Sequence, residues 1–188
     1  MTEQIYSLLI QVMPYLAIVV FIALFFVQAG YGIFHTKKWG WSIPNKIGWI
    51  LMDAPAFIVL FYLWWTSSVR FEIPELIFFL LFELHYFQRS FVFPLLMKGN
   101  SQMPISILAM GVLFNSINGF LLGESLFHLV SDTFYTAAWF GQPLSVAGLF
   151  LFFIGMAVNL HSDHVIRNLR PAGDTRHYLP QKGMYRFV

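Results

Sequence analysis

Five long apolar stretches follow one another along the chain, and short polar segments separate them. Each has about the 20 mostly apolar residues that an α-helix needs to cross the hydrocarbon core of a bilayer. The pattern predicts spans at about 5–33, 47–65, 74–97, 104–126 and 143–165. We therefore expect an all-α protein, a polytopic transmembrane helical bundle with about five spans in this chain.

Positive charges are unevenly distributed over the polar segments. Three lysines lie in the first loop (35–46), and five basic residues lie in the tail (167–188), whereas the second loop has only Arg70 and the fourth has no Lys or Arg. Cytoplasmic loops carry the excess of Lys and Arg. We therefore expect the N-terminus outside or in the lumen, and the tail in the cytoplasm. The sequence leaves open whether the membrane is a bacterial inner membrane or the endoplasmic reticulum.

Composition agrees with a lipid-facing surface. The chain is 58% hydrophobic and 11% charged, with a mean hydropathy of +0.67, whereas a soluble domain carries about 25% charged residues. No small-residue cleavage pattern follows the first apolar stretch, so we expect no removable signal peptide. The absence of cysteine excludes disulfides and thiolate metal sites. A net charge of +2 gives no indication of nucleic-acid binding.

An acid lies inside the second span. Asp53 is about two turns in, and Pro55 lacks the N–H that would bond a carbonyl one turn earlier. Ionisable groups at this depth are costly and need a partner or a cavity. Either Asp53 is bonded to a neighbouring helix beside a proline kink, or it lines a functional cavity.

The third span holds the densest polar cluster. Its members lie within seven residues and share helix faces at spacings of three and four: Glu83, His85, Tyr86, Gln88 and Arg89. Arg89 by itself fits an interfacial anchor, with Tyr86 in the aromatic belt. An acid and a histidine together are unusual at a lipid-facing helix end, which favours a functional cluster.

The fifth span ends in a polar stripe. At ~100° per residue, Asn159, Asp163 and Arg170 fall within about 40° on one face. Such a set can bind a ribose or amide and a phosphate, or it can be an amphipathic end anchored to lipid headgroups. His161 and His164 lie nearby, but no metal-site spacing occurs, and we predict no metal. Glycine-rich phosphate motifs are also absent, so helix side chains and the tail would hold any nucleotide.

Taken in order, these segments resemble the steroid 5α-reductase (3-oxo-5α-steroid 4-dehydrogenase) family over almost the whole chain. The specific part is Asn159-Leu-His-Ser-Asp-His-Val-Ile-Arg-Asn-Leu-Arg170, followed by Gly173-Asp-Thr and Leu179-Pro-Gln-Lys-Gly183. Supporting segments are His85-Tyr-Phe-Gln-Arg-Ser-Phe-Val92, Asn118-Gly119, and Gly30-Tyr-Gly32 ahead of His35-Thr36.

The resemblance implies NADPH-dependent reduction of the C4=C5 double bond of a 3-ketosteroid or similar enone lipid, with membrane lipids as surroundings. Tyr86 matches the family tyrosine that bonds the ketone, and Asp53 matches its partner acid. A phenol and a protonated carboxyl can both donate to a developing oxyanion. The positions assigned to the cofactor are Tyr31, Asn159, Asp163, Arg167, Arg170 and His177. Those assigned to the substrate are Glu83, Arg89 and Asn118.

Three departures from the family pattern affect these expectations. The family acid expected at position 53 is glutamate, which is one methylene longer than Asp53. The tail reads Arg176-His-Tyr-Leu-Pro180, where a tyrosine followed by a basic residue is expected. The family fold has seven spans, so we expect residues 1–188 to form a single membrane domain with a truncated cytosolic cofactor segment at 166–188.

Other functions stay open from the sequence. A related membrane enzyme could reduce polyprenol or enoyl lipids, and a membrane methyltransferase could share the helical architecture. A truncated protein could instead be a non-catalytic scaffold. Binding of NADPH rather than S-adenosylmethionine separates the reductase from the methyltransferase.

Overall fold

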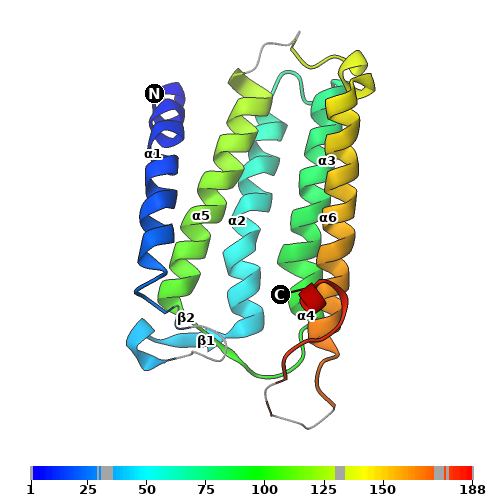
Figure 1. Ribbon diagram of the computed structural model, residues 1–188. Coiled ribbons are helices and arrows are strands. Elements are labelled where there is room, and N and C mark those ends of the chain that lie inside the picture. Colours follow the sequence, from blue (N-terminus) through cyan, green and yellow to red (C-terminus); the bar gives the residue numbers. More distant parts are fainter. Residues whose placement is uncertain are drawn as a thin grey trace. The chain divides into compact units, whose positions relative to one another are not determined.

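In the part of the chain that the computed structural model describes, five helices are long and apolar enough to cross a membrane, which confirms the predicted all-α, five-span architecture (Figure 1). The structure describes residues 2–28, 30, 36–129, 134–171, 176 and 178–187. The long helices are α1 (Thr2–Ala23), α2 (Asn45–Thr66), α5 (Ile105–Glu124) and α6 (Pro143–Arg167), and the third span, Ile73–Leu96, begins with the shorter α3 (Ile73–Phe87). A π-helical turn (Gln88–Val92) joins α3 to α4 (Phe93–Leu96), and a second π-helical turn (Ser125–Leu129) ends α5. Short 3₁₀ turns occupy Lys37–Trp39, Ala137–Gly141 and Gly183–Phe187.

Prolines mark where the helices begin. Pro44 and Pro104 directly precede α2 and α5, and Pro74 and Pro143 lie in the first turns of α3 and α6. The first turn tolerates proline because its N–H groups have no partner within the helix. The predicted end of the first span at 33 is wrong, because α1 ends at Ala23.

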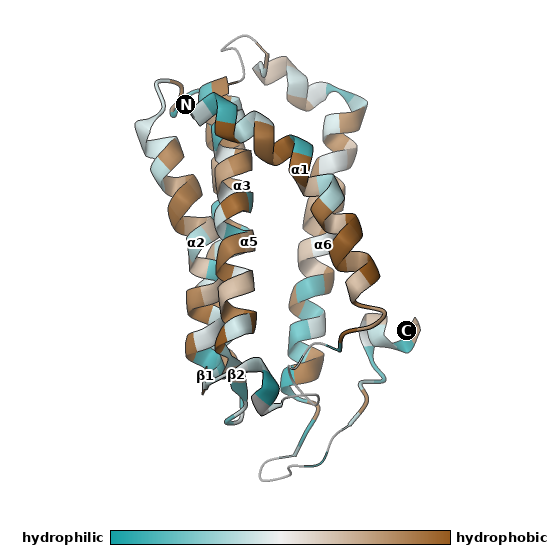
Figure 2. Cartoon of the chain, turned by 90° about the vertical axis from the view of Figure 1, so that its left-hand side faces the viewer, coloured by the Kyte–Doolittle hydropathy of each residue, from teal (hydrophilic) through white to brown (hydrophobic). Residues whose placement is uncertain are grey.

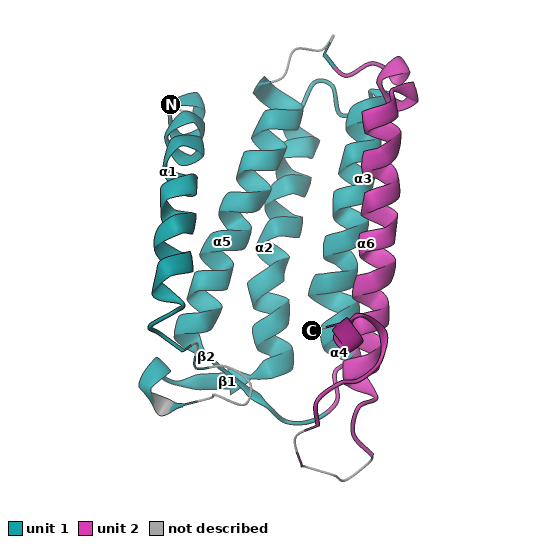
Figure 3. Cartoon of the chain, in the orientation of Figure 1, with its two compact units in different colours: residues 1–95, 99–134 teal, residues 96–98, 135–188 magenta. Residues whose placement is uncertain are grey.

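The chain forms two compact units (Figure 3). The first unit comprises Met1–Leu95 and Gly99–Phe134, with α1, α2, α3 and α5. The second unit comprises Leu96–Lys98 and Tyr135–Val188, with α6 and the tail. Each unit is described separately below.

A two-stranded sheet joins the first and third loops of the first unit. Strand β1 (Ser42–Pro44) pairs antiparallel with β2 (Gln102–Pro104), with Ile43 opposite Met103. The Met103 side chain is 1% exposed and packs where Gly48 leaves room at the start of α2. These two loops therefore lie at the same end of the first unit.

The second and fourth loops meet at the other end of these helices. The Ser67 hydroxyl donates to the Phe127 carbonyl at 2.8 Å. His128 Nε2 lies 3.1 Å from the Leu63 carbonyl, and the Trp64 indole N–H donates to the Arg70 carbonyl at 2.8 Å. Odd and even loops are thus grouped at opposite ends of the unit, as an antiparallel bundle requires.

The buried apolar core of the first unit lies between α2, α3 and the end of α5. Its fully packed members are Leu60, Leu63, Trp64, Phe79 and Phe127. The rings of Trp64 and Phe79 stack with centroids 4.0 Å apart. In contrast, α1 has no buried residue and is apolar around most of its surface (Figure 2).

In the second unit, the tail folds back onto the end of α6. Gly183 adopts φ +63°, and a Cβ there would lie 2.6 Å from the His161 ring. This close approach and the left-handed backbone both favour glycine. The Lys98 ammonium donates to the side chain of Asn168 at 2.9 Å, just after α6 ends.

Candidate functional site

The site begins with close packing of α2 against α5. A Cβ on Gly119 would lie 2.9 Å from the Ala56 carbonyl oxygen, and one on Gly123 would lie 2.7 Å from Leu63. A Cβ on Gly111 would lie 2.2 Å from the Met52 side chain. Small residues let membrane helices approach closely enough for side chains to bond across the interface.

This approach places Asn115 of α5 against Asp53 of α2. The Asn115 side-chain N–H₂ donates to Asp53 Oδ1 at 3.1 Å and to the Met52 carbonyl at 2.9 Å. Asn115 is 7% exposed and Asp53 is 5% exposed. The sequence allowed two interpretations of Asp53, a bond to a neighbouring helix or a place in a functional cavity. The bond to a neighbouring helix is present. This bond is compatible with a functional role as well.

Arg89 supplies the second partner of Asp53. Its Nε lies 3.9 Å from Asp53 Oδ2. The guanidinium lies over two aromatic rings, 4.6 Å from the centroid of Trp49 and 4.4 Å from that of Phe93. The charge is held inside the unit by an acid and two π faces, whereas an interfacial anchor would extend to the headgroups.

Tyr86 bonds across the unit to α5. The Asn118 side-chain N–H₂ donates to the Tyr86 hydroxyl oxygen at 2.8 Å. The Phe82 ring stacks on Tyr86 with centroids 4.5 Å apart, and His85 meets it edge-on at 5.3 Å. Among the described residues this is the hydroxyl's one hydrogen bond. Because the oxygen accepts this bond, the phenolic hydrogen is available to a ligand.

Glu83 lies one turn before Tyr86 on α3 and is buried, with 7% of its surface exposed. Neither of its carboxyl oxygens has a hydrogen-bond partner among the described residues. The Ser90 hydroxyl, fully buried in the π-helical turn, has none there either. π-Helical turns are frequent at functional sites.

The first unit thus brings together Asp53 with Arg89, and Tyr86 with Asn118, four of the five residues that the sequence assigned to catalysis or to the substrate. The fifth, Glu83, lies on the same helix as Tyr86. Sequence reasoning missed Asn115. Its signal was present: Gly111, Asn115, Gly119 and Gly123 recur every four residues, which places them on one face of α5.

The second unit holds the predicted cofactor residues of α6 and the tail. Asn159, Asp163 and Arg167 follow one another at four-residue spacing on α6, and each is half-buried. The predicted extension of the helical stripe to Arg170 is wrong, because α6 ends at Arg167. Pro171 disfavours helical backbone at Arg170.

Two further predicted cofactor residues, Tyr31 and His177, lie outside the described residues. The donor set in the second unit suits a dinucleotide. An amide and a carboxylate can bond ribose hydroxyls, and guanidinium groups can bind phosphate.

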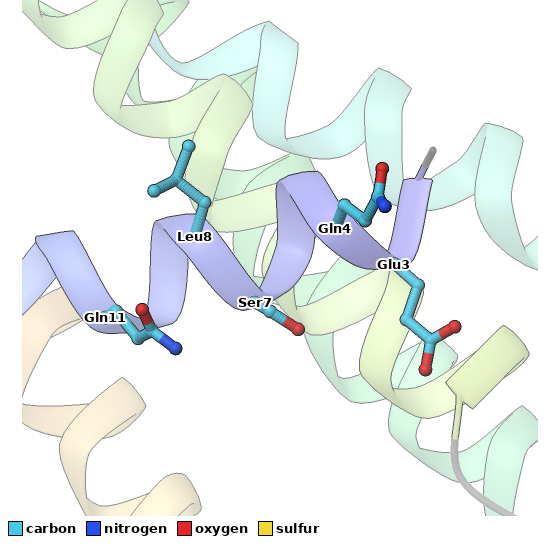
Figure 4. Close-up of a pocket in the computed structure, with 5 residues that line it drawn as sticks. All are labelled: Glu3, Gln4, Ser7, Leu8 and Gln11. Atoms are coloured by element: carbon cyan, nitrogen blue, oxygen red, sulfur yellow. The ribbon is translucent and has the colours of Figure 1, made fainter.

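A surface hollow on α1 contains none of the predicted residues. Glu3, Gln4, Ser7, Leu8 and Gln11 line it, all from one exposed helix (Figure 4). A hollow formed by a single helix cannot enclose a ligand, so the interior of the first unit is the better candidate.

The arrangement defines a multi-span membrane protein whose polar side chains bond across an apolar interior. The sequence profile of 3-oxo-5-alpha-steroid 4-dehydrogenase matches residues 101–188. The chain is 30% identical over 176 residues to 3-oxo-5-alpha-steroid 4-dehydrogenase 1 of Mus musculus. The aligned region covers 93% of this chain and 68% of the mouse protein. It is 34% identical to the type 2 protein of Sus scrofa over 171 residues, 89% of this chain and 66% of that protein.

A plant protein is similar as well. Steroid 5-alpha-reductase DET2 of Gossypium hirsutum is 32% identical over 180 residues, covering 92% of this chain and 68% of the plant protein. The chain belongs to the steroid 5α-reductase family of membrane oxidoreductases. It spans about two thirds of the length of these three relatives.

Proposed function

We propose that this protein reduces the C4=C5 double bond of a 3-ketosteroid or a similar enone lipid, with NADPH as the reductant. The observation that carries the proposal is the bond from Asn118 to the Tyr86 hydroxyl, inside a chain similar to 3-oxo-5-alpha-steroid 4-dehydrogenases. The reaction consumes one enone, one NADPH and one proton, and it yields the saturated ketone and NADP⁺.

Tyr86 is the proposed donor to the substrate carbonyl. Its oxygen accepts from Asn118, so its O–H can donate to the carbonyl oxygen. Negative charge grows on that oxygen during reduction, and a fixed donor in a water-poor site stabilises it strongly. The bond from Asn118 orients the phenol and makes it a better donor, because linked hydrogen bonds polarise one another.

Asp53 and Arg89 form a second part of the proposed site. The carboxyl is held by Asn115 on one oxygen and faces Arg89 on the other. Aspartate is one methylene shorter than the glutamate expected in the family, and Asn115 fixes its position at this length. We infer that Asp53 acts either as a second donor to the carbonyl or by holding Arg89 near the developing charge.

The cofactor residues of this proposal are Asn159, Asp163, Arg167 and Arg170. When bound, NADPH would supply the hydride that adds to C5 of the enone. Asn159 and Asp163 would bond ribose or amide groups, and the two arginines would bind phosphate, including the 2′-phosphate that distinguishes NADPH from NADH.

The test is an assay of membranes containing the protein with NADPH and a Δ4-3-ketosteroid, with the saturated product measured by mass. Tyr86→Phe should lower kcat by about 10²–10³-fold, the effect of removing one oxyanion donor, while NADPH binding is retained. Asp53→Asn should also lower turnover. Tyr62→Phe, an exposed tyrosine of α2, is the matched control.

Several results would contradict the assignment. Unchanged turnover in both Tyr86→Phe and Asp53→Asn would refute the proposed site. Failure of the protein to bind NADPH or turn over any enone would refute the reaction. Turnover of a polyprenol enone instead of the steroid would show that the substrate belongs to the alternative class of lipids. Binding of S-adenosylmethionine would favour the methyltransferase.

We also propose that the N-terminus faces outward or toward the lumen and that the tail is cytoplasmic. The loops with the lysines pair through β1 and β2, and the lysine-poor loops meet at the other end. The chain has no cysteine, so single cysteines report topology cleanly. With the protein in a bacterial inner membrane, an impermeant maleimide should label Ser68→Cys in sealed cells, and it should label Lys38→Cys and Asn100→Cys only after permeabilisation. The reverse pattern would invert the topology.

A further inference from the structure

Glu83 lies on the inward face of α3, within the polar interior of the first unit. Four residues earlier, Phe79 stacks on Trp64 of α2, and three residues later Tyr86 bonds to Asn118 of α5. These spacings place Glu83 on the face directed at the neighbouring helices. Its 7% exposure agrees with that position.

The carboxyl of Glu83 has an unused capacity for hydrogen bonding. Both of its oxygens are buried without a partner among the described residues. The Ser90 hydroxyl, four residues after Tyr86, is likewise buried without one there. Polar atoms without a partner in the described part of the chain therefore precede Tyr86 on α3 and follow it in the π-helical turn. Buried polar groups in native structures are nearly always bonded, so this segment is suited to a polar ligand group.

The chemistry of the missing partner follows from the carboxyl. An ionised carboxylate only accepts hydrogen bonds, and a protonated one still has acceptor capacity, so the partner must be a donor. An ammonium group would bring a second desolvated charge into the membrane, at high cost. An uncharged hydroxyl supplies the donor without that cost.

We propose that Glu83 binds a hydroxyl group that the enone substrate carries close to its carbonyl. Glu83 and Tyr86 are three residues apart, a rise of ~4.5 Å along the helix. The hydroxyl therefore lies about one helical turn from the carbonyl that Tyr86 binds. This inference rests on the proposed function and narrows its substrate to a hydroxylated lipid enone.

The experiment compares androst-4-ene-3,17-dione with its derivatives that bear one hydroxyl at C6, C11 or C19. The protein in membranes is assayed with NADPH, and kcat/KM for each derivative is divided by kcat/KM for the parent dione. At least one derivative should exceed the dione by about 10-fold or more, because the dione leaves a buried polar group unpaired. In Glu83→Leu that ratio should fall to about one or below.

The matched control is Glu75→Leu, which removes another buried carboxyl from the same helix, further from Tyr86. Its ratio should equal that of the wild-type protein. Glu83→Gln keeps the shape and an acceptor oxygen, so it should retain part of the preference even if Glu83→Leu does not fold. A wild-type ratio near one for all three derivatives would overturn the inference, as would an unchanged ratio in Glu83→Leu.

Ligand-induced thermal stabilisation separates this inference from the proposed reaction. If no enone is turned over, the proposed function fails. A hydroxylated enone that stabilises the wild-type protein, but not Glu83→Leu, would still support the binding role of Glu83. Equal stabilisation of both proteins by the dione and its derivatives would overturn it.

Discussion

Helices α1 and α2 are both 22 residues long and both apolar enough to cross a membrane, yet they are packed very differently. No residue of α1 is buried, whereas seven residues of α2 are buried, among them Asn45, Gly48, Asp53 and Ala56. The two helices have similar numbers of small and polar residues, but the polar residues of α1 lie in its first half, whereas Gly48, Asp53 and Ala56 of α2 lie on its buried face. Hydropathy therefore identifies a span, whereas small and polar residues identify the face that another helix covers.

The largest effect should come from enlarging a residue at the α2–α5 contact. Gly119→Leu would place side-chain atoms where even a Cβ lies 2.9 Å from the Ala56 carbonyl oxygen. Backbone cannot move aside cheaply, so we expect loss of the folded protein or of all NADPH-dependent turnover. Size-exclusion profiles and activity in detergent measure both outcomes.

The matched substitution is Gly148→Leu in α6, where nothing lies within 4 Å of the added Cβ. It should leave the elution profile unchanged. If Gly119→Leu and Gly148→Leu changed the elution profile and the turnover equally, the expected sensitivity of the α2–α5 contact would be contradicted.

A smaller loss of stability should follow from a substitution that creates a cavity beside α2. Leu60 is 0% exposed, whereas Leu16 of α1 is 47% exposed. Leu60→Ala removes buried contacts and should cost about 2–5 kcal/mol, which lowers Tm by roughly 5–15 °C. Leu16→Ala should change Tm by less than about 2 °C. Similar losses from both variants would contradict the contrast between the helices.

Asn115→Leu should have a moderate effect on stability and a clear effect on activity. It removes the donor to Asp53 Oδ1 and leaves that buried oxygen unpaired, at about 1–3 kcal/mol. Turnover should fall by about 10-fold or more if Asp53 serves the reaction. Ser116→Ala is the control, because the Ser116 hydroxyl bonds within α5, to the Val112 carbonyl. A normal kcat in Asn115→Leu would show that the bond from Asn115 to Asp53 is not needed for catalysis.

The smallest effect should come from a polar residue of α1. Gln11 is exposed at the hollow on this helix, so Gln11→Leu should change stability by less than about 0.5 kcal/mol. Thermal unfolding and the steroid assay should both match the wild-type protein. A large loss of stability or of turnover would mean that the polar face of α1 has a partner. The exposure of Gln11 in this structure would then not describe its surroundings in the membrane.

Much of the candidate site could be selected from the sequence, because each charged or polar residue inside a span is unusual there. This reasoning found Asp53, Tyr86, Glu83 and Arg89. It did not find Asn115, because the role of this residue depends on its register with the neighbouring glycines of α5 and on the close approach of α2. It also extended the polar stripe of α6 to Arg170, although α6 ends at Arg167.

The sequence by itself determined the number of spans, most of their boundaries, and the family. These depend on local properties: the transfer of apolar residues into lipid, the effect of proline on backbone, and the identity of motif residues. Only the tertiary structure decided that Asp53 is bonded by Asn115 and faces Arg89, that Asn118 donates to Tyr86, and that Glu83 is buried with no partner among the residues described. Such pairings depend on how close two helices lie and on their relative register, and both are set by packing between segments far apart in the chain.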